Sequence, residues 1–250
     1  RLPTVDMEPQ RIHEAMRYAV LSPGKRLRPI FALAVTELAG SPPEIMIDAA
    51  CGIEYAHAAS LILDDLPCMD NAHQRRGRGC THKEFGEATA LLAAMALLTG
   101  AFDLVGKAAM VCQRTGLSAA ATGLLAEALG PKGLVYGQHL DLHYTGKKAS
   151  LEVLEHIHRM KAGALFLAAI TIPARLLEMP ANDIGALEHY AYNIGLAFQI
   201  TDDLLDEQAP AEDANKSTFT TYLGRDGARA RVAWLIAEAI QVIQRFESRS

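Results

Sequence analysis

Two clusters of aspartates are the residues of this sequence whose types and spacing are best suited to chemistry. Each cluster follows a long apolar stretch, and the members are Asp64, Asp65 and Asp70 in the first and Asp202, Asp203 and Asp206 in the second. Closely packed carboxylates raise one another's pKa or need a cation, and Mg²⁺ prefers oxygen ligands while keeping waters that phosphate oxygens can replace. The two clusters therefore predict a magnesium site that faces a phosphorylated substrate.

A single cluster of this kind is weak evidence, because runs of acids also end many helices that simply face solvent. Asp202 and Asp206 are four residues apart and therefore share one helix face. Pro67, in contrast, interrupts the first helix between Asp65 and Asp70. We therefore expect the loop after Pro67 to curl and bring Asp70 back to the metal.

Basic side chains flank the first cluster in short groups that suit phosphate oxygens. Lys25 and Arg28 precede it, and Arg75 and Arg76 follow it with two planar guanidinium groups. His57 lies two turns before the cluster on nearly the same helix face. A charged turn is often only solvated, and a lone histidine in an apolar helix is more often a core residue. The pattern alone therefore leaves these roles open.

The elements that must position these residues are predicted to be helices. About ten helical runs alternate with short Gly or Pro breaks, and no segment alternates with a period of two long enough to form a sheet. The pattern predicts an all-α bundle, with helices over residues 10–21, 29–39, 43–66, 84–112, 117–129, 134–142, 151–177, 182–207 and 225–250. Outside these helices, His73 and His82 are expected at the surface.

The composition narrows the class of protein further. Half of the 250 residues are hydrophobic, which is enough for one large core, and we expect a single domain over residues 1–250. The formal net charge of −5 argues against a nucleic-acid partner. Four cysteines without CxxC spacing favour a reducing, cytoplasmic setting. The longest uncharged run, residues 88–102, is shorter than the roughly 20 residues that span a bilayer, so no transmembrane segment is expected.

Together these motifs resemble those of the all-trans short-chain prenyl diphosphate synthases, above all the bacterial carotenoid-type geranylgeranyl diphosphate synthases. The resemblance extends from about residue 14 to about residue 231 and rests on Gly24-Lys25-Arg26-Leu27-Arg28-Pro29, His57 to Asp70, Arg75-Arg76-Gly77, Phe85-Gly86-Glu87-Ala88, Gly137-Gln138 with Asp141, Lys161, Phe198-Gln199 with the second cluster, and Lys216-Ser217-Thr218. It implies the isoprenoid synthase fold around a deep cavity and a homodimer. It also implies Mg²⁺-dependent condensation of isopentenyl diphosphate with dimethylallyl, geranyl or farnesyl diphosphate.

The resemblance implies a role for each matching residue. More than one Mg²⁺ ion would be bound by Asp64, Asp65, Asp70, Asp202 and Asp206. Catalysis would depend on Asp64, Asp65, Arg75, Lys161, Asp202 and Asp203. The isopentenyl diphosphate would be held by Lys25, Arg28, His57 and Arg76. The allylic substrate would be held by Arg75 and Lys161, and the substrate-binding set is completed by Gln199 and Lys216. Gln138 and Asp141 would line the cavity or have a structural role.

The chain departs from the family pattern at two places. Ala162 stands where the family has a Thr after the lysine, so one hydroxyl is missing there. The segment over residues 207–215 is shorter than the family loop that carries a Gly-Lys-Asp sequence. Either this loop is truly short or residues are missing from it, and both ends of the chain are short in the same comparison.

The length of the product is expected to depend on two small residues before the first cluster. Ser60 lies about 6 Å from Asp64 along the helix, with Ala59 just beyond it. The resemblance implies that many farnesyl diphosphate synthases carry an aromatic residue at the position of Ala59, which closes the cavity. Ala59 leaves it open and predicts the C20 product geranylgeranyl diphosphate, with the C15 product as the alternative.

Two other interpretations remain. One is a catalytically silent subunit of a prenyl synthase, against which the six intact aspartates argue. The other is a di-iron carboxylate bundle, because the pairs Glu54 with His57 and Glu155 with His158 each have the Glu-x-x-His spacing. That interpretation leaves the arginine pair and both aspartate clusters unexplained.

Overall fold

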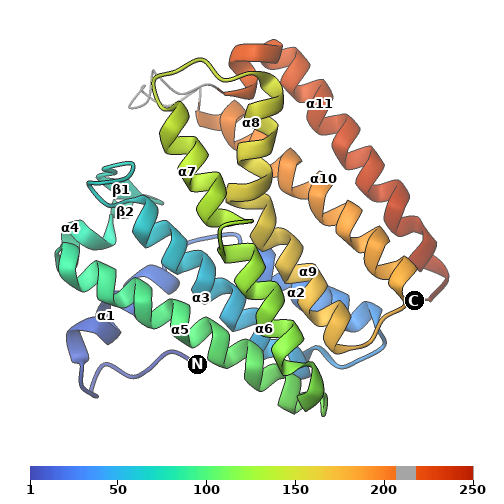
Figure 1. Ribbon diagram of the computed structural model, residues 1–250, viewed down its shortest axis with the longest axis horizontal. Helices are drawn as coiled ribbons and strands as arrows, with labels where there is room; N and C mark the ends of the chain where they lie inside the picture. The colour runs from blue at the N-terminus through green and yellow to red at the C-terminus, as the bar shows by residue number, and fades with distance from the viewer. Residues whose placement is uncertain (207–217, 250) are drawn as a thin grey trace. The chain divides into compact units, whose positions relative to one another are not determined.

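The computed structural model describes residues 1–206 and 218–249, and about three quarters of them are helical (Figure 1). The elements are α1 (Gln10–Val20), α2 (Leu27–Leu38), η1 (Pro43–Met46), α3 (Ile47–Asp64), α4 (Thr81–Phe85), α5 (Glu87–Val111), η2 (Thr115–Leu117), α6 (Ser118–Leu129), α7 (Leu134–Tyr144), α8 (Leu151–His158), η3 (Arg159–Gly163), α9 (Ala164–Leu176), α10 (Ala181–Asp206), α11 (Phe219–Ile243) and η4 (Gln244–Arg249). Within the described residues, strand pairing is limited to a short antiparallel hairpin of β1 (Gln74–Arg75) and β2 (Arg78–Gly79). The prediction of an all-α protein is confirmed. Lys216, predicted to bind substrate, lies outside the described residues.

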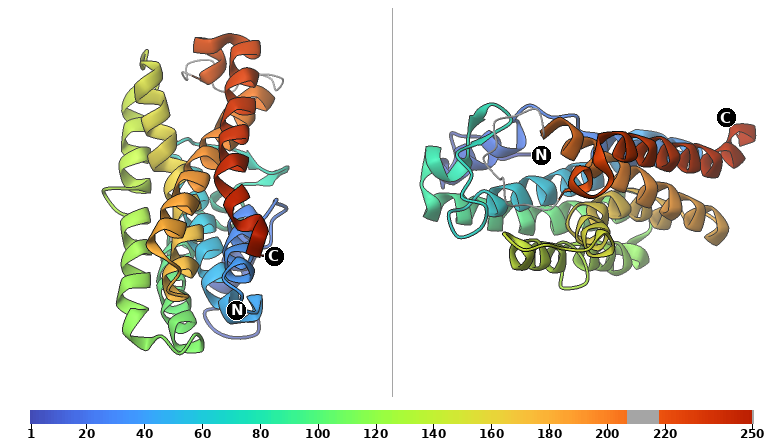
Figure 2. Two further views of the ribbon diagram at one scale, coloured as in Figure 1. Left: turned by 90° about the vertical axis from the view of Figure 1, so that its right-hand side faces the viewer. Right: turned by 90° about the horizontal axis from the view of Figure 1, so that it is seen from above.

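The helices form two compact units, Arg1–Thr122 and Gly123–Ser250, and the expectation of a single domain stays a prediction. In the first unit, α3 and α5 lie side by side (Figure 2). Small residues permit this close approach: a Cβ added to Gly52 of α3 would lie 2.8 Å from the carbonyl oxygen of Ala101 in α5. Since dense packing leaves no room for such an atom, Gly52 fixes the distance between the two helices.

The first unit also shows where the predicted helix boundaries were wrong. The sequence predicted one helix over residues 84–112, but the structure has α4 and then α5, with Gly86 between them at a φ of 84°. Glycine adopts this conformation at little cost, whereas other residues do so with strain. The residues around Gly86 are mostly polar, so apolar periodicity gave no signal there and the predicted helix began at residue 84 instead of 87.

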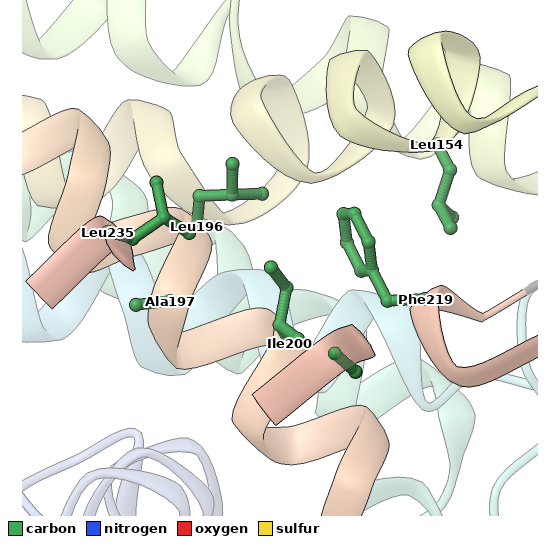
Figure 3. Packing of buried hydrophobic residues seen from close by; sticks show 7 residues of the cluster. Leu154, Leu196, Ala197, Ile200, Phe219 and Leu235 are labelled. Atoms are coloured by element: carbon green, nitrogen blue, oxygen red, sulfur yellow. The ribbon is translucent and has the colours of Figure 1, made fainter. Parts of the chain in front are cut away.

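In the second unit, α10 and α11 run side by side (Figures 1 and 2). Their shared core contains Leu196 and Ile200 of α10, Phe219 and Leu235 of α11 and Leu154 of α8 (Figure 3). All five side chains are buried, which is the main source of stability for helices whose own propensity is marginal.

Helix α11 begins earlier than the predicted residue 225. The Thr218 side chain accepts a hydrogen bond from the Thr221 amide while the Thr221 hydroxyl accepts one from the Thr218 amide, so the two residues form a capping box. Gly224, at a φ of 66°, then bends the chain, and the predicted start at 225 matches this bend rather than the true beginning of the helix.

In the described part of the chain, two helices are long and apolar enough to cross a membrane by length and composition alone. They are the stretch Pro43–Asp64, with 61% of its most apolar window buried, and α5, with 39% buried. Core helices of folded proteins also meet these two criteria, and α3 has this buried character. The expectation that no segment spans a membrane stays a prediction.

Candidate active site

The first aspartate cluster is shaped by the turn that follows α3. The Asp70 amide donates a hydrogen bond to the Asp64 carbonyl oxygen at 2.9 Å, and the Asn71 amide donates to the Leu66 carbonyl oxygen at 3.0 Å. Asn71 closes this turn with a φ of 50°, a conformation that asparagine tolerates better than most residues. The loop thus curls back and brings Asp70 to the end of α3, as the sequence predicted.

Within this cluster, Asp65 anchors Arg75. Asp65 is 3% exposed, and its Oδ1 accepts hydrogen bonds from Arg75 Nε, at 2.9 Å, and from Arg75 Nη2. Arg75 Nη2 also lies 3.8 Å from Asp64 Oδ2. Burial acts to lower the pKa of Arg75, but the hydrogen bond and charge of Asp65, together with Asp64, outweigh it and raise that pKa. Asp65 therefore fixes a permanently charged guanidinium between itself and Asp64.

A second group of cations converges on His57. His57 Nε2 lies 3.4 Å from both Arg28 Nη1 and Arg76 Nη2, and because guanidinium groups can only donate, Nε2 accepts. Burial, followed by the charges of Arg28, Arg76, Arg26 and Arg75, holds the pKa of His57 well below its usual value. His57 is therefore a neutral acceptor that orients Arg28 and Arg76.

A small pocket in the first unit is lined by Arg26, His57, Asp65, Arg75 and Arg76, together with Tyr18, Ser22 and Thr81. Glu54 is buried at 7% exposure in the pocket wall and pairs with Arg26. Two buried carboxylates, Glu54 and Asp65, face three guanidinium groups in the lining. This leaves an excess of one positive charge, which suits a diphosphate anion.

Backbone geometry determines where Arg76 lies. Arg76 has a φ of 55° and is followed by Gly77 at 75°, so the chain reverses sharply after Arg75. The Arg76 guanidinium lies against Gly24, where an added Cβ would be 2.5 Å from Arg76 Nη1. Lys25, next to Gly24, is exposed on the same turn. Gly24 therefore provides the space that Arg76 occupies.

In the second unit, Lys161 lies in an unusual turn. Arg159–Gly163 form a π-helical turn, a feature often found at functional sites, within the segment predicted as one helix over 151–177. Lys161 Nζ forms an ion pair with Asp141 Oδ2 of α7 at 2.7 Å. A Cβ on Gly137 would lie 2.6 Å from Lys161 Cα, so Gly137 allows α7 to touch the π turn. The Gly137 and Asp141 motif therefore has a structural role in holding Lys161.

The second aspartate cluster lies at the end of α10, where Asp202 and Asp203 are half-buried. Asp203 Oδ2 accepts a hydrogen bond from the Phe219 amide at 2.8 Å, so this carboxylate holds the first residue of α11. Gln199, one turn earlier, accepts at Oε1 a hydrogen bond from His158 Nδ1 at 3.2 Å. Asp203 therefore supports the local structure of the cluster.

The sequence misplaced His82. It is only 6% exposed in α4, and neither ring nitrogen has a hydrogen-bond partner in the described part of the chain. Burial lowers the pKa of His82, so it is neutral at pH 7. Its position in a short helix of mixed polarity gave no periodic signal of burial. The burial of Glu54 had a clearer signal in the sequence, since it is the one acid among residues 49–63, the apolar stretch that contains His57.

The di-iron interpretation does not fit the contacts of its proposed ligands. Glu54 pairs with Arg26, and Glu155 Oε1 lies 3.1 Å from Arg231 Nη2. Both carboxylates are thus engaged by arginines.

A helical fold with an aspartate cluster beside a guanidinium-lined pocket is suited to the class of enzymes that bind diphosphates. A family profile described as polyprenyl synthetase matches residues 9–249. Geranylgeranyl pyrophosphate synthase 4 of Arabidopsis thaliana is 40% identical over 97% of this chain and 68% of its own length. The farnesyl diphosphate synthase of Geobacillus stearothermophilus is 37% identical over 92% and 81%. A crystal structure of an FPP/GFPP synthase from Zymomonas mobilis has a TM-score of 0.90 at 35% identity, covering 99% of this chain and 87% of that one.

The chain belongs to the polyprenyl synthetase family. It is a trans-prenyltransferase with the isoprenoid synthase fold, and the resemblance stated from its motifs is confirmed.

Proposed function

We propose that this enzyme condenses isopentenyl diphosphate with an allylic diphosphate and that its main product is the C20 geranylgeranyl diphosphate. The observation that carries the proposal is the arrangement of Arg75 and Arg76, adjacent residues with different partners. Arg75 is fixed beside Asp64 and Asp65, whereas Arg76 joins Arg28 at His57. Two neighbouring cationic groups suit a reaction with two diphosphate substrates. Curated relatives named geranylgeranyl pyrophosphate synthases support the C20 product.

The aspartates fit the proposed Mg²⁺ ions by the chemistry of their donors. Asp64 and Asp70 are half-buried carboxylates joined by the backbone hydrogen bond of the turn, and carboxylate oxygens are the ligands that Mg²⁺ prefers. Asp202 and Asp206 would supply the second set. When bound, the ions would neutralise the diphosphate that leaves the allylic substrate. Asp65 is committed to Arg75, so we assign it the task of holding that arginine rather than direct metal binding.

The residues of the chain have separate tasks in this reaction. Arg75 and Lys161 stabilise the negative charge that develops on the leaving diphosphate. Lys25, Arg28, His57 and Arg76 hold isopentenyl diphosphate so that its double bond attacks the allylic cation. A proton then passes to the departing diphosphate. Since water would quench the cation, the site must exclude it during the reaction.

We propose that the enzyme is a homodimer and that it acts in the cytoplasm. Leu91, Leu92 and Met95 of α5 are 43%, 49% and 61% exposed, an apolar surface that a second copy of the chain would cover. Gel filtration with light scattering tests this assembly, and a mass of one chain at micromolar concentration would contradict it.

The function is tested by separating the products that the isolated chain makes from isopentenyl diphosphate with dimethylallyl, geranyl or farnesyl diphosphate and Mg²⁺. We expect C20 products from all three starters. A wild-type product that stops at C15 would support the farnesyl alternative, and no product at all would support a silent subunit.

The metal assignment is tested with Asp64→Ala and Asp202→Ala, each of which should lower turnover by at least about 100-fold because transition-state charge loses its stabilisation. Asp226→Ala, which changes a fully exposed acid of α11, is the matched control and should leave turnover unchanged. Near-normal turnover of Asp64→Ala at saturating Mg²⁺ would show that the cluster is not the metal site.

A further inference from the structure

His158 is a half-buried residue that the proposed chemistry does not use. It is the last residue of α8 and directly precedes the π turn that carries Lys161. Its Nδ1 lies 3.2 Å from Gln199 Oε1 on α10. Because an amide oxygen only accepts hydrogen bonds, Nδ1 carries the proton.

The same imidazole also packs against α11. Its ring centroid lies 5.3 Å from that of Phe219, with 31° between the ring planes. The Phe219 amide in turn donates to Asp203 Oδ2. His158 thus contacts Gln199, which lies one turn before the second aspartate cluster. It also contacts Phe219, whose backbone amide holds Asp203.

The surroundings keep His158 neutral. Burial lowers its pKa to about 4; Asp141 and the hydrogen bond to Gln199 oppose this effect, and Lys161 adds to it. At neutral pH the imidazole therefore has one proton, and the contact with Gln199 fixes that proton on Nδ1. A neutral ring in a single tautomer is a well-defined donor.

We propose that His158 is a positioning residue that fixes the orientation of the Gln199 amide toward the allylic substrate. With its oxygen engaged by His158, Gln199 presents its NH₂ group, a hydrogen-bond donor, to the bound substrate. An amide free to rotate by 180° would offer an oxygen to an anionic substrate half of the time. This inference rests on the proposed function, in which Gln199 binds substrate.

Two substitutions separate the hydrogen bond from the packing. His158→Phe keeps a ring against Phe219 but removes the donor, whereas His158→Asn keeps a donor near the position of Nδ1 but removes the ring. We expect His158→Phe to retain the wild-type Tm and to lower kcat/KM for the allylic substrate about fivefold, the effect of one neutral hydrogen bond. KM for isopentenyl diphosphate should not change. His158→Asn should have the lower Tm and nevertheless recover most of the allylic kcat/KM.

The outcome is decided by the comparison among variants. Wild-type kcat/KM in His158→Phe, or equal losses in both variants, would overturn the positioning role. In a Gln199→Leu background, His158→Phe should cause no further loss, and an independent further loss would also overturn it. If the wild-type chain makes no product, the proposed function fails, and ¹⁵N NMR of labelled histidine then tests the contact directly. The spectrum should show His158 protonated on Nδ1 in the wild type, and protonation on Nε2 would refute the inference.

Discussion

Arg75 and Arg76 illustrate how adjacent residues of one type receive different tasks. Arg75 lies in the short strand β1 and is fixed by Asp65, while Arg76 adopts a positive φ that turns its side chain to His57 and Gly24. Planar guanidinium groups bind phosphate oxygens with defined geometry, so their directions determine which substrate each one meets.

Replacement of each arginine should therefore affect a different substrate. Arg76→Ala should raise KM for isopentenyl diphosphate by about tenfold or more, the cost of a charge-assisted hydrogen bond, and change that for the allylic substrate less. Arg75→Ala should have the reverse effect. Arg78→Ala, in the same hairpin but exposed and stacked on Tyr18, is the control. Steady-state kinetics with each substrate varied in turn provides the measurement, and equal effects of both changes on both substrates would contradict the division.

Substitution of Gly24 tests the placement of the Arg76 guanidinium without removing its charge. A Cβ in Gly24→Ala would displace the Arg76 guanidinium, which is the mobile end of a long side chain. We expect KM for isopentenyl diphosphate to rise a few-fold with little change in kcat or Tm. Gly185→Ala in α10, where an added Cβ meets nothing within 4 Å, should leave KM unchanged. In an Arg76→Ala background the Gly24→Ala effect should vanish, and a persistent effect would mean that Gly24 acts through another group.

The sequence could predict which residue types gather at the site but could not predict their pairing. The acids and bases stood out by their spacing, and the return of Asp70 followed from Pro67. That Asp65 holds Arg75, and that Glu54 holds Arg26, depends on contacts between helices that no local period encodes. His82 was missed for the same reason.

At the scale of elements, apolar periodicity predicted most helices and missed the places where they are interrupted. The break at Gly86 is set by a single glycine with positive φ, and the π turn at Arg159–Gly163 lies against Gly137 of α7. The predicted helices over residues 84–112 and 151–177 ran through both features. At Gly224, in contrast, the predicted helix began one residue after the bend and missed only the first turns of α11.

Helix α3 carries the residues predicted to determine product length. Ala59 is fully buried, and the Ser60 hydroxyl donates to the His57 carbonyl oxygen at 2.8 Å, so both small side chains are fixed within the helix. We propose that the growing chain passes this part of α3, about 6 Å from Asp64 along the helix axis.

Ala59→Phe should accordingly shift the product from C20 to C15, because a ring in the path of the tail would overlap an additional isoprene unit. Ala59→Val should give a mixture, and a melting curve of each variant shows whether overpacking also weakens the fold. Product chromatography after single incubations measures the ratio. If Ala59→Phe makes C20 at the wild-type ratio, another helix closes the cavity.

At the scale of the whole molecule, the fold holds several histidines neutral. The pKa of His57 lies well below its usual value of 6.5, that of His158 is about 4, and that of His82 is also lowered, each chiefly by burial. In the unfolded chain these groups would take up protons near pH 6.5. The unfolded state thus binds more protons than the folded state below that pH, and acid favours unfolding.

The free energy of unfolding should therefore be highest with respect to these histidines above about pH 7, where they are neutral in both states. It should decrease as the pH falls from 6.5 toward 4. A shift such as that of His158, from 6.5 to about 4, corresponds to at most about 3 to 4 kcal/mol. Melting curves at pH 7.5, 6 and 5 should show a steady fall in Tm, and His158→Phe, which has no proton to bind at this position, should show a smaller fall. His73→Phe, at an exposed position, should keep the wild-type slope. If His158→Phe and the wild type lose Tm equally over this range, burial of His158 does not contribute to the acid sensitivity, and His57 or His82 must account for it.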